Sequence, residues 1–185
     1  VRSPENKELY GNDNIIRRGD LLHCDVGIEY MGMTTDMQHL AYVCKIDEED
    51  APDGLQKVYK QGLRFQQICL EEMKEGSSGN EILAKVLERG NTENLNPWMY
   101  SHPVNYFGHG SGMTIGRTEN QKFLPGSGEH PLYNGTTYAL EFSVTGTVPE
   151  WGNTDVRMGF EENMVFNNGK AWLIDGYPQK LYLIK

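Results

Sequence analysis

Cysteine is scarce in this chain of 185 residues, and long apolar runs are missing from it. The three cysteines, Cys24, Cys44 and Cys69, have neither the even count of a disulfide framework nor the spacing of a zinc knuckle, so we expect buried free thiols. No apolar stretch approaches the roughly 18 residues that a membrane-spanning helix needs. No signal peptide is visible; because the sequence opens on Val1, we take it to be trimmed, and the compartment stays open with the cytoplasm favoured.

Basic residues are outnumbered: Lys and Arg total 17 against 26 Asp and Glu, which gives a net charge of −9. This balance argues against a nucleic acid or an anionic membrane as partner and is compatible with an acidic cation site. Hydrophobic residues make up 38% of the chain and charged residues 23%, values typical of a folded protein rather than a disordered one. We therefore expect one domain over residues 1–185.

The order of predicted elements indicates an α+β fold. Apolar runs predict strands at 21–28 and 41–44, and apolar residues among charged neighbours predict helices at 52–75 and 81–88. β-branched and aromatic residues between turn signals predict strands at 137–147, 161–167, 171–174 and 181–184. Ser78 and Glu81 form a candidate capping box for the second helix, and residues 1–14 read as a loosely held polar lead-in. Strands, two helices and strands again favour a helix layer on a curved, mostly antiparallel sheet.

Asp25 and Asp36 are the most informative pair in the sequence. They lie eleven residues apart, at equal distances from the centre of a predicted loop over 29–32. We therefore predict that they are direct cross-strand partners, with Cβ atoms about 5 Å apart. Two ionised carboxylates at that distance repel each other, and a pair of divalent ions about 3.5–4 Å apart would neutralise them. The alternative is a surface hairpin that carries two acids.

Further candidate ligands follow downstream. His109 lies in a glycine-rich bend, Glu141 interrupts an apolar strand, and Glu161 leads into another, while His102 precedes the bend. Each has an ordinary alternative as a polar loop residue or a solvent-facing strand position. Taken together, the carboxylates and the imidazole suit two hard or borderline divalent ions, with Mn²⁺ favoured and Co²⁺, Fe²⁺ or Zn²⁺ possible, rather than a thiolate zinc site.

Four motifs carry a resemblance to a known family. They are Asp25-Val26-Gly27 with Asp36, Gly108-His109-Gly110-Ser111-Gly112, Leu140-Glu141-Phe142 and Phe160-Glu161-Glu162. In order and context they resemble the motifs of the M24 metallopeptidases, the group of methionine aminopeptidases, Xaa-Pro aminopeptidases and prolidases. The surroundings of His102-Pro103 and of residues 114–116 and 149–152 look closer to the Xaa-Pro enzymes.

The resemblance implies a fold, an activity and a set of roles. The fold is the pita-bread fold, with the family's N-terminal part missing, so that the chain is a truncated catalytic portion. The activity is that of a dinuclear exopeptidase of the aminopeptidase P or prolidase type, in which a hydroxide shared by two metals attacks the first peptide bond. Asp25 holds one ion, His109 and Glu141 hold the other, Asp36 and Glu161 bridge them, and Glu141 also serves as general base.

Two departures from the family pattern concern the substrate pocket. The family places a second His where Gly116 stands here, and we expect His102 to take its role. The Xaa-Pro enzymes carry an Arg two residues before the last Glu, where this chain has Gly159, and Arg157 is the nearest candidate. The implied partners are a peptide substrate and a second copy of the chain in a homodimer. The alternatives are a peptide- or protein-binding module without catalysis and a creatinase-like amidinohydrolase.

Overall fold

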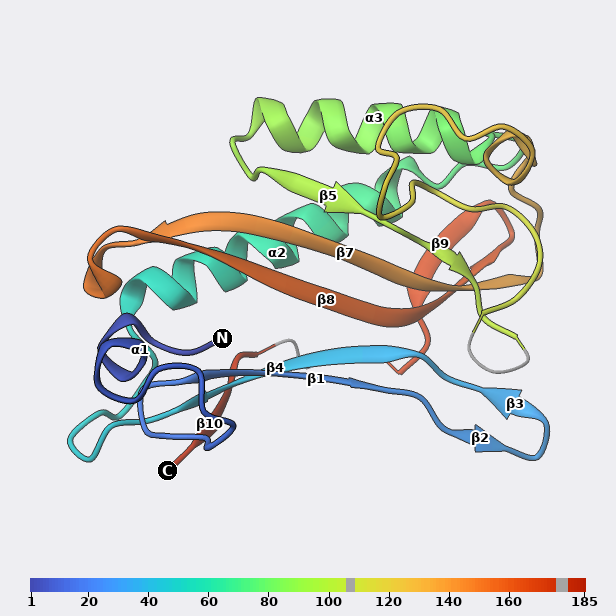
Figure 1. Ribbon diagram of the computed structural model, residues 1–185. Coiled ribbons are helices and arrows are strands. Elements are labelled where there is room, and N and C mark those ends of the chain that lie inside the picture. The colour runs from blue at the N-terminus through green and yellow to red at the C-terminus, as the bar shows by residue number, and fades with distance from the viewer. Residues whose placement is uncertain (106–108, 176–179) are drawn as a thin grey trace.

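The computed structural model describes residues 1–105, 109–175 and 180–185 (Figure 1). Its helices are α1 (Pro4–Tyr10), α2 (Asp53–Glu72) and α3 (Gly79–Thr92), with 3-10 turns η2 (Ser127–Glu129) and η3 (Pro149–Trp151). Its strands are β1 (Leu21–Val26), β2 (Glu29–Tyr30), β3 (Met33–Thr34), β4 (Met37–Val43), β5 (Pro97–Met99), β6 (His102–Pro103), β7 (Thr136–Val148), β8 (Thr154–Asn167), β9 (Lys170–Leu173) and β10 (Tyr182–Ile184). In this part of the chain, no helix is both long and apolar enough to cross a bilayer.

One curled sheet forms the centre of the structure. Its strands run in the order β1-β4-β8-β7-β5, and β10, β6 and β9 pair with β4, β7 and β8. All these pairings are antiparallel except that of β10 with β4. Helices α2 and α3 lie together on one side of the long β7–β8 pair, and the β1–β4 hairpin lies on another side of it (Figure 1). The predicted α+β class with a mostly antiparallel sheet is confirmed.

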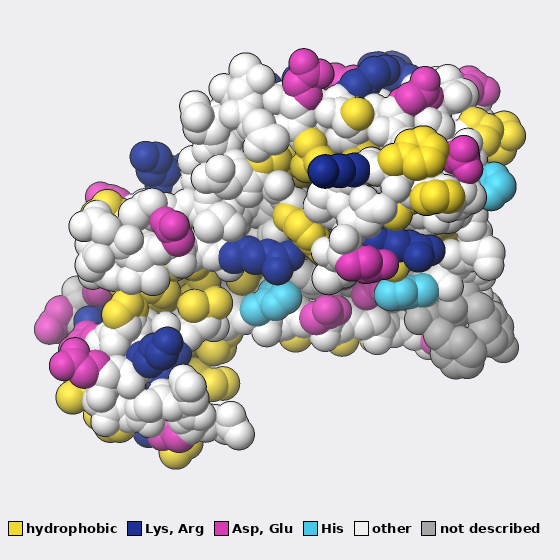
Figure 2. Space-filling model, turned by 45° about the horizontal axis from the view of Figure 1, so that its top comes forward, with side chains coloured by type: hydrophobic (Ala, Val, Ile, Leu, Met, Phe, Trp, Pro, Cys, Tyr) yellow, Lys and Arg dark blue, Asp and Glu magenta, His cyan; other side chains and the backbone are white. Residues whose placement is uncertain are grey.

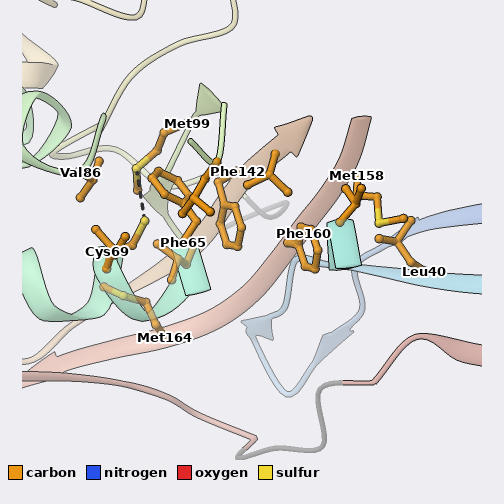
Figure 3. Close-up of a cluster of buried hydrophobic side chains, with 14 of the residues drawn as sticks. Leu40, Phe65, Cys69, Val86, Met99, Phe142, Met158, Phe160 and Met164 are labelled. Atoms are coloured by element: carbon orange, nitrogen blue, oxygen red, sulfur yellow. Dashed lines mark hydrogen bonds between the residues drawn. The ribbon is translucent and has the colours of Figure 1, made fainter. Parts of the chain in front are cut away.

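Side chains of β7 and β8 point alternately to the two faces of the sheet, so the core residues and the candidate ligands lie on opposite faces. Leu140, Phe142 and Phe160 belong to the buried core, where the rings of Phe142 and Phe160 are stacked at 5.2 Å (Figure 3). Helix α2 adds Phe65, whose ring meets Phe142 edge-on at 5.3 Å. Because successive side chains of a strand point to opposite faces, Glu141 projects to the face away from these rings. The apolar residues thus anchor the strands that carry the candidate ligands.

The helices follow the sequence expectation closely. Ser78 caps α3 through the backbone N–H of Glu81, and the Glu81 side chain accepts from the backbone N–H of Ser78, so the predicted capping box is confirmed. The helix continues past the predicted end at residue 88 to Thr92. In α2 the predicted end at residue 75 is three residues too late, because the backbone is already extended at Met73.

Two expectations about the N-terminal part of the chain are wrong. Residues 1–14 are not a loose lead-in, because helix α1 lies within them and is capped by the Ser3 side chain. Buried Asp20 holds this segment by accepting from the Ser3 backbone N–H at 3.1 Å and from the Asn6 side chain at 2.9 Å. Cys24, on the exposed second half of the edge strand β1, is exposed, whereas Cys44 and Cys69 are buried as expected.

Candidate metal centre

The hairpin that carries Asp25 and Asp36 has a different register from the predicted one. Met31 and Gly32 form a two-residue turn, both with positive φ (53° and 77°), and the strands on either side pair about this turn. The centre of the hairpin therefore lies one residue later than expected, and Asp25 faces Gln38. Direct pairing of Asp25 with Asp36 is wrong. The two aspartates are diagonal neighbours on one face, which still lets their side chains meet.

A first row of polar residues crosses four strands of the sheet. Asp25 on β1 pairs with Gln38 on β4, Gln38 pairs with Glu161 on β8, and Glu161 pairs with Glu141 on β7. Since directly paired residues point to the same face, their side chains converge on one side of the sheet. Four residues that are far apart in the sequence thus lie side by side across the sheet.

A second row runs beside the first, two residues later on β8 and two residues earlier on the antiparallel strand β7. Asn163 pairs with Ala139, which in turn pairs with His102 on β6. At the other end, the Asn163 side chain accepts a hydrogen bond of 3.1 Å from the backbone N–H of Asp36. Successive same-face positions on a strand are about 7 Å apart. The second row therefore brings Asp36 and His102 alongside the carboxylates of the first.

His109 completes the cluster from a loop. Its Nε2 atom lies 3.4 Å from Oδ2 of Asp36, and its ring is 4.1 Å from the ring of His102. Gly108, part of the predicted glycine-rich motif, lies outside the described residues. His109 itself is largely exposed, whereas His102 is buried, so the two imidazoles differ in their access to solvent.

The predicted ligands meet in three overlapping groups, in each of which one ligand atom per residue lies within 4.8 Å of the others. The groups are Asp25, Asp36 and Glu161; Asp36, His102 and His109; and His102, Glu141 and Glu161. All five predicted ligands are therefore brought together. His102, predicted to act on the substrate, also lies within reach of a metal site.

Glu161 and its neighbour Glu162 belong to opposite faces of β8. Glu161 is 2% exposed and lies in the candidate centre, with Oε1 3.7 Å from Nε2 of His102. Glu162 points the other way, where its Oε1 is 3.8 Å from Nδ1 of His39. Burial and then the carboxylate of Asp175 raise the pKa of Glu162 to about 7. The structure thus places Glu161, and not Glu162, among the candidate ligands.

Burial and crowding raise the pKa values of the acidic side chains in this cluster. Burial and then the carboxylate of Glu161 raise the pKa of Glu141 to about 7. The same two causes raise the pKa of Asp36 above its ordinary value. Burial alone would lower the pKa of His102, but the carboxylate of Glu161 and the carbonyl of Pro103 raise it above its ordinary value. These acids need a positive partner.

Divalent ions fit this cluster by the chemistry of its donors. Nε2 of His102 is buried and has no hydrogen-bond partner among the described residues. Among the described residues, the basic side chains within ion-pair distance of Asp36 and Glu161 are histidines rather than lysine or arginine. Carboxylates with imidazole are the ligand set of borderline divalent ions. Histidine and acidic side chains also lie next to one another beside the hollowed part of the surface (Figure 2).

Two residues of the site face differ from the sequence expectation. Arg157, a candidate catalytic residue, lies apart from the acids: its Nε donates to Oγ of Ser143 at 2.7 Å, and its guanidinium lies over the ring of Trp98 at 4.6 Å. Sequence reasoning missed Gln38, whose side-chain amide donates to Oε1 of Glu141 at 3.2 Å. Its signal was available, since Gln38 follows Asp36 by two residues on an alternating strand and so shares its face.

The cluster opens into space for a ligand. Asp36 and His109 line a cavity of about 420 Å³, together with residues 27–29 and 34–35 of the hairpin that contains β2 and β3. A second cavity of about 500 Å³ adjoins it on the other side of Thr34 and Thr35, and Asn163 of the second row forms part of its lining. Clefts of this volume accommodate small molecules and short peptides.

Comparisons with known proteins agree with this geometry. The sequence matches the model of metallopeptidase family M24 over residues 3–168. It matches no curated protein.

Solved structures share the fold at low sequence identity. An X-Pro aminopeptidase from Thermotoga maritima MSB8 is 15% identical, with a TM-score of 0.70 over 98% of this chain and 47% of its own. A prolidase from Pyrococcus furiosus is 18% identical, with a TM-score of 0.63 over 95% and 48%. The N-terminal domain of FACT complex subunit SPT16 from chickpea (Cicer arietinum) is 13% identical, with a TM-score of 0.64 over 92% and 39%. The chain thus spans about half the length of the two enzymes.

Proposed function

Because the chain belongs to metallopeptidase family M24 and has the pita-bread fold of such enzymes, we propose that it is the catalytic portion of a dinuclear, metal-dependent exopeptidase. Its substrate is a peptide from which it removes the N-terminal residue, ahead of proline. One observation carries this proposal: the candidate ligands meet in three overlapping groups beside an open cavity. A surface hairpin with two acids would not gather Glu141, Glu161 and two histidines around them.

Asp36 and Glu161 are the bridging ligands in this proposal. They share one group with Asp25, and each of them also belongs to one further group, which in both cases contains His102. Because a carboxylate has two oxygen atoms, Asp36 and Glu161 could each contact two ions, whereas Nε2 of His102 could contact one. Asp25 belongs only to the group with both of them, while His109 and Glu141 belong to the two other groups. By the family resemblance, Asp25 would hold one ion, and His109 and Glu141 would hold the other. Two divalent ions held there would lower the pKa of a water molecule and polarise the carbonyl of the peptide bond.

The chain's own residues supply proton transfer and orientation. Glu141 lies at the end of the first row and acts as general base: it accepts a proton from the attacking water and passes it to the leaving amine as the C–N bond breaks. His102, buried at the end of the second row, donates a hydrogen bond to the developing oxyanion from Nε2. Arg157, on the same face beyond Ser143, attracts the carboxylate end of a short substrate.

Preference for proline after the cleaved bond has two supports. The sequence around His102-Pro103 resembles that of Xaa-Pro peptidases. The folds similar to this one include an X-Pro aminopeptidase and a prolidase. Those structures are less than 25% identical to the chain, so they support its fold. The panel of dipeptides and tripeptides described next measures its preference for proline.

A panel of Xaa-Pro and Xaa-Ala dipeptides and tripeptides, incubated with Mn²⁺- or Co²⁺-loaded protein, tests the proposal. We expect release of the first residue from Xaa-Pro substrates and no activity after chelation. Asp36→Ala should abolish this activity, because one residue serves two of the three groups. Elemental analysis or anomalous scattering should find two ions. A loaded protein that holds two ions and cleaves no peptide would contradict the catalytic part of the proposal.

A second candidate is a peptide-binding module without catalysis. Gly116 at the position of the family's second His favours it. Such a module would bind short peptides in the cavity beside Asp36 without cleaving them, and binding would not depend on added Mn²⁺. Isothermal titration with the uncleaved dipeptides, with and without chelator, separates the two candidates.

A further inference from the structure

Gln38 is the neutral member of the first row, between acids on three strands. It is 8% exposed, and its backbone pairs with Asp25 on one side and Glu161 on the other. Its side chain reaches past Glu161 to Glu141, where Nε2 donates to Oε1 at 3.2 Å. On its other side, Oε1 of Gln38 lies 2.8 Å from Nε2 of His23 on β1. A hydrogen-bonded chain therefore runs from His23 through Gln38 to Glu141.

Only one orientation of the Gln38 amide satisfies both contacts. A carboxylate can accept but not donate, so the amide nitrogen must face Glu141 and the amide oxygen must face His23. His23 therefore donates from Nε2. If the amide turned over, its oxygen would face the carboxylate and that hydrogen bond would be lost, whereas a neutral His23 could still pair with the amide in its other tautomer. Glu141 thus fixes which end of Gln38 it meets, and His23 holds the opposite end of the amide.

Gly159 leaves the space in which this chain of hydrogen bonds lies. A Cβ atom at position 159 would be 2.8 Å from Oε1 of Gln38 and 3.2 Å from Nε2 of His23. Real Cβ contacts are essentially never as close as the first of these, so any side chain at 159 would push the amide away. Gln38 can therefore extend to Glu141 only because position 159 has no side chain.

We infer that Gln38, held by His23 and accommodated by Gly159, is a positioning residue for Glu141 in the metal centre. By holding Oε1, the amide fixes the rotation of the carboxylate so that its second oxygen is presented to an ion. This inference rests on the proposed function, because it assigns Glu141 a metal to bind. Hydrogen bonds to ligating carboxylates of this kind commonly change metal affinity by about 10–100-fold when they are removed.

The test compares Mn²⁺ affinity by isothermal titration in wild type and in Gln38→Met, which preserves the length of the side chain and removes the amide. We expect the affinity of Gln38→Met to fall about 10–100-fold with little change in Tm of the metal-free protein. The matched control is Gln66→Met on α2, which removes a buried amide whose nitrogen has no partner among the described residues. It should leave Mn²⁺ affinity unchanged. Equal affinities for wild type and Gln38→Met would overturn the inference.

A double-mutant cycle separates positioning from general damage to the sheet. Gly159→Ala keeps both Gln38 and His23 but displaces the amide, so it should reproduce most of the loss of affinity seen in Gln38→Met. In a Gln38→Ala background the same substitution meets no amide and should cost no further affinity. Additive losses would mean that Gly159 acts independently of Gln38, and the accommodating role of Gly159 would be wrong.

A third measurement distinguishes failure of this inference from failure of the proposed function. In the metal-free protein, the side-chain amide protons of Gln38 should be protected from exchange in NMR spectra, and Glu141→Gln or Gly159→Ala should shift them. If wild type bound no Mn²⁺ while these shifts appeared, the metal centre would be wrong and the hydrogen-bonded chain would stand. If wild type bound Mn²⁺ and the amide protons were unprotected, the positioning role would be wrong.

Discussion

Glu141 and Glu161 face each other directly on neighbouring antiparallel strands, with their backbones in register. Like charges directly opposite one another destabilise a sheet, and here the arrangement coincides with burial and with a pKa for Glu141 of about 7. Nothing in the packing of the core requires these two acids, since the aromatic residues beside them face the helices. The pair therefore supports the proposed ion site, where a bound cation would offset this repulsion.

Removing one charge of this pair should have opposite effects on stability and on metal binding. We expect Glu161→Gln to stabilise the metal-free protein by up to about 1 kcal/mol and to abolish high-affinity Mn²⁺ binding, because Glu161 belongs to two ligand groups. Chemical denaturation and isothermal titration measure the two effects. Glu162→Gln, one residue along and on the opposite face of β8, is the matched control and should retain Mn²⁺ affinity. Loss of binding in the control alone would mean that the faces are assigned wrongly.

Binding of divalent ions should raise the stability of the whole chain. An ion that binds only the folded state at 100 times its Kd adds about 2.7 kcal/mol to the free energy of unfolding. We expect Mn²⁺ or Co²⁺ to raise Tm and EDTA to reverse the rise, measured by calorimetry. Mg²⁺ should do less, because it prefers all-oxygen ligands and two histidines belong to this cluster. Asp36→Ala should remove the response, and a response that persists in this variant would place the ions elsewhere.

The N-terminal segment should make stability sensitive to acid through Asp20. Burial opposes its ionisation, but hydrogen bonds from Asn6 and from the backbone of Ser3 and Arg17 lower the pKa of Asp20 below its ordinary value. A carboxyl whose folded pKa is depressed contributes stability above its unfolded pKa, and that contribution is lost as pH falls through the folded value.

The corresponding variant is Asp20→Asn. We expect it to lose about 2 kcal/mol at neutral pH, since hydrogen bonds to a charged group are removed, and to show a smaller further loss between about pH 4 and pH 2 than wild type. Urea denaturation at a series of pH values measures both. Exposed Asp47→Asn should leave the wild-type pH profile unchanged. A profile for Asp20→Asn that parallels wild type would contradict the role of Asp20.

Close packing of α2 on the sheet should make Gly62 intolerant of a side chain. A Cβ atom at this position would be 2.1 Å from Cζ of Phe160, whose ring stacks on Phe142. Alanine normally stabilises a helix relative to glycine by about 1 kcal/mol, but overpacking of a core costs about 1–3 kcal/mol. We therefore expect Gly62→Ala to lower the free energy of unfolding. Lys60→Ala, exposed on the same helix, should be close to neutral, and stabilisation by Gly62→Ala would show that α2 lies further from β8.

The sequence alone determined much of the fold and the identity of the predicted ligands. β-branched and aromatic residues between turn signals located β7, β8 and β9 within a few residues, apart from the first half of β8, and the Ser78–Glu81 capping box located the start of α3. These features depend on residues near one another in the chain, so local patterns are sufficient to read them. The strands β5 and β6 were missed because each has only two or three residues, too few for a period to appear.

Tertiary structure decided how the ligands meet. The positive φ values of Met31 and Gly32 set the hairpin register, which made Gln38 rather than Asp36 the partner of Asp25. Which of Glu161 and Glu162 entered the cluster depended on the pairing of β8 with β4 and β7. A shift of one residue in register reverses the face of every side chain on a strand. Sequence therefore determined which groups this protein carries, and long-range pairing determined which of them share a site.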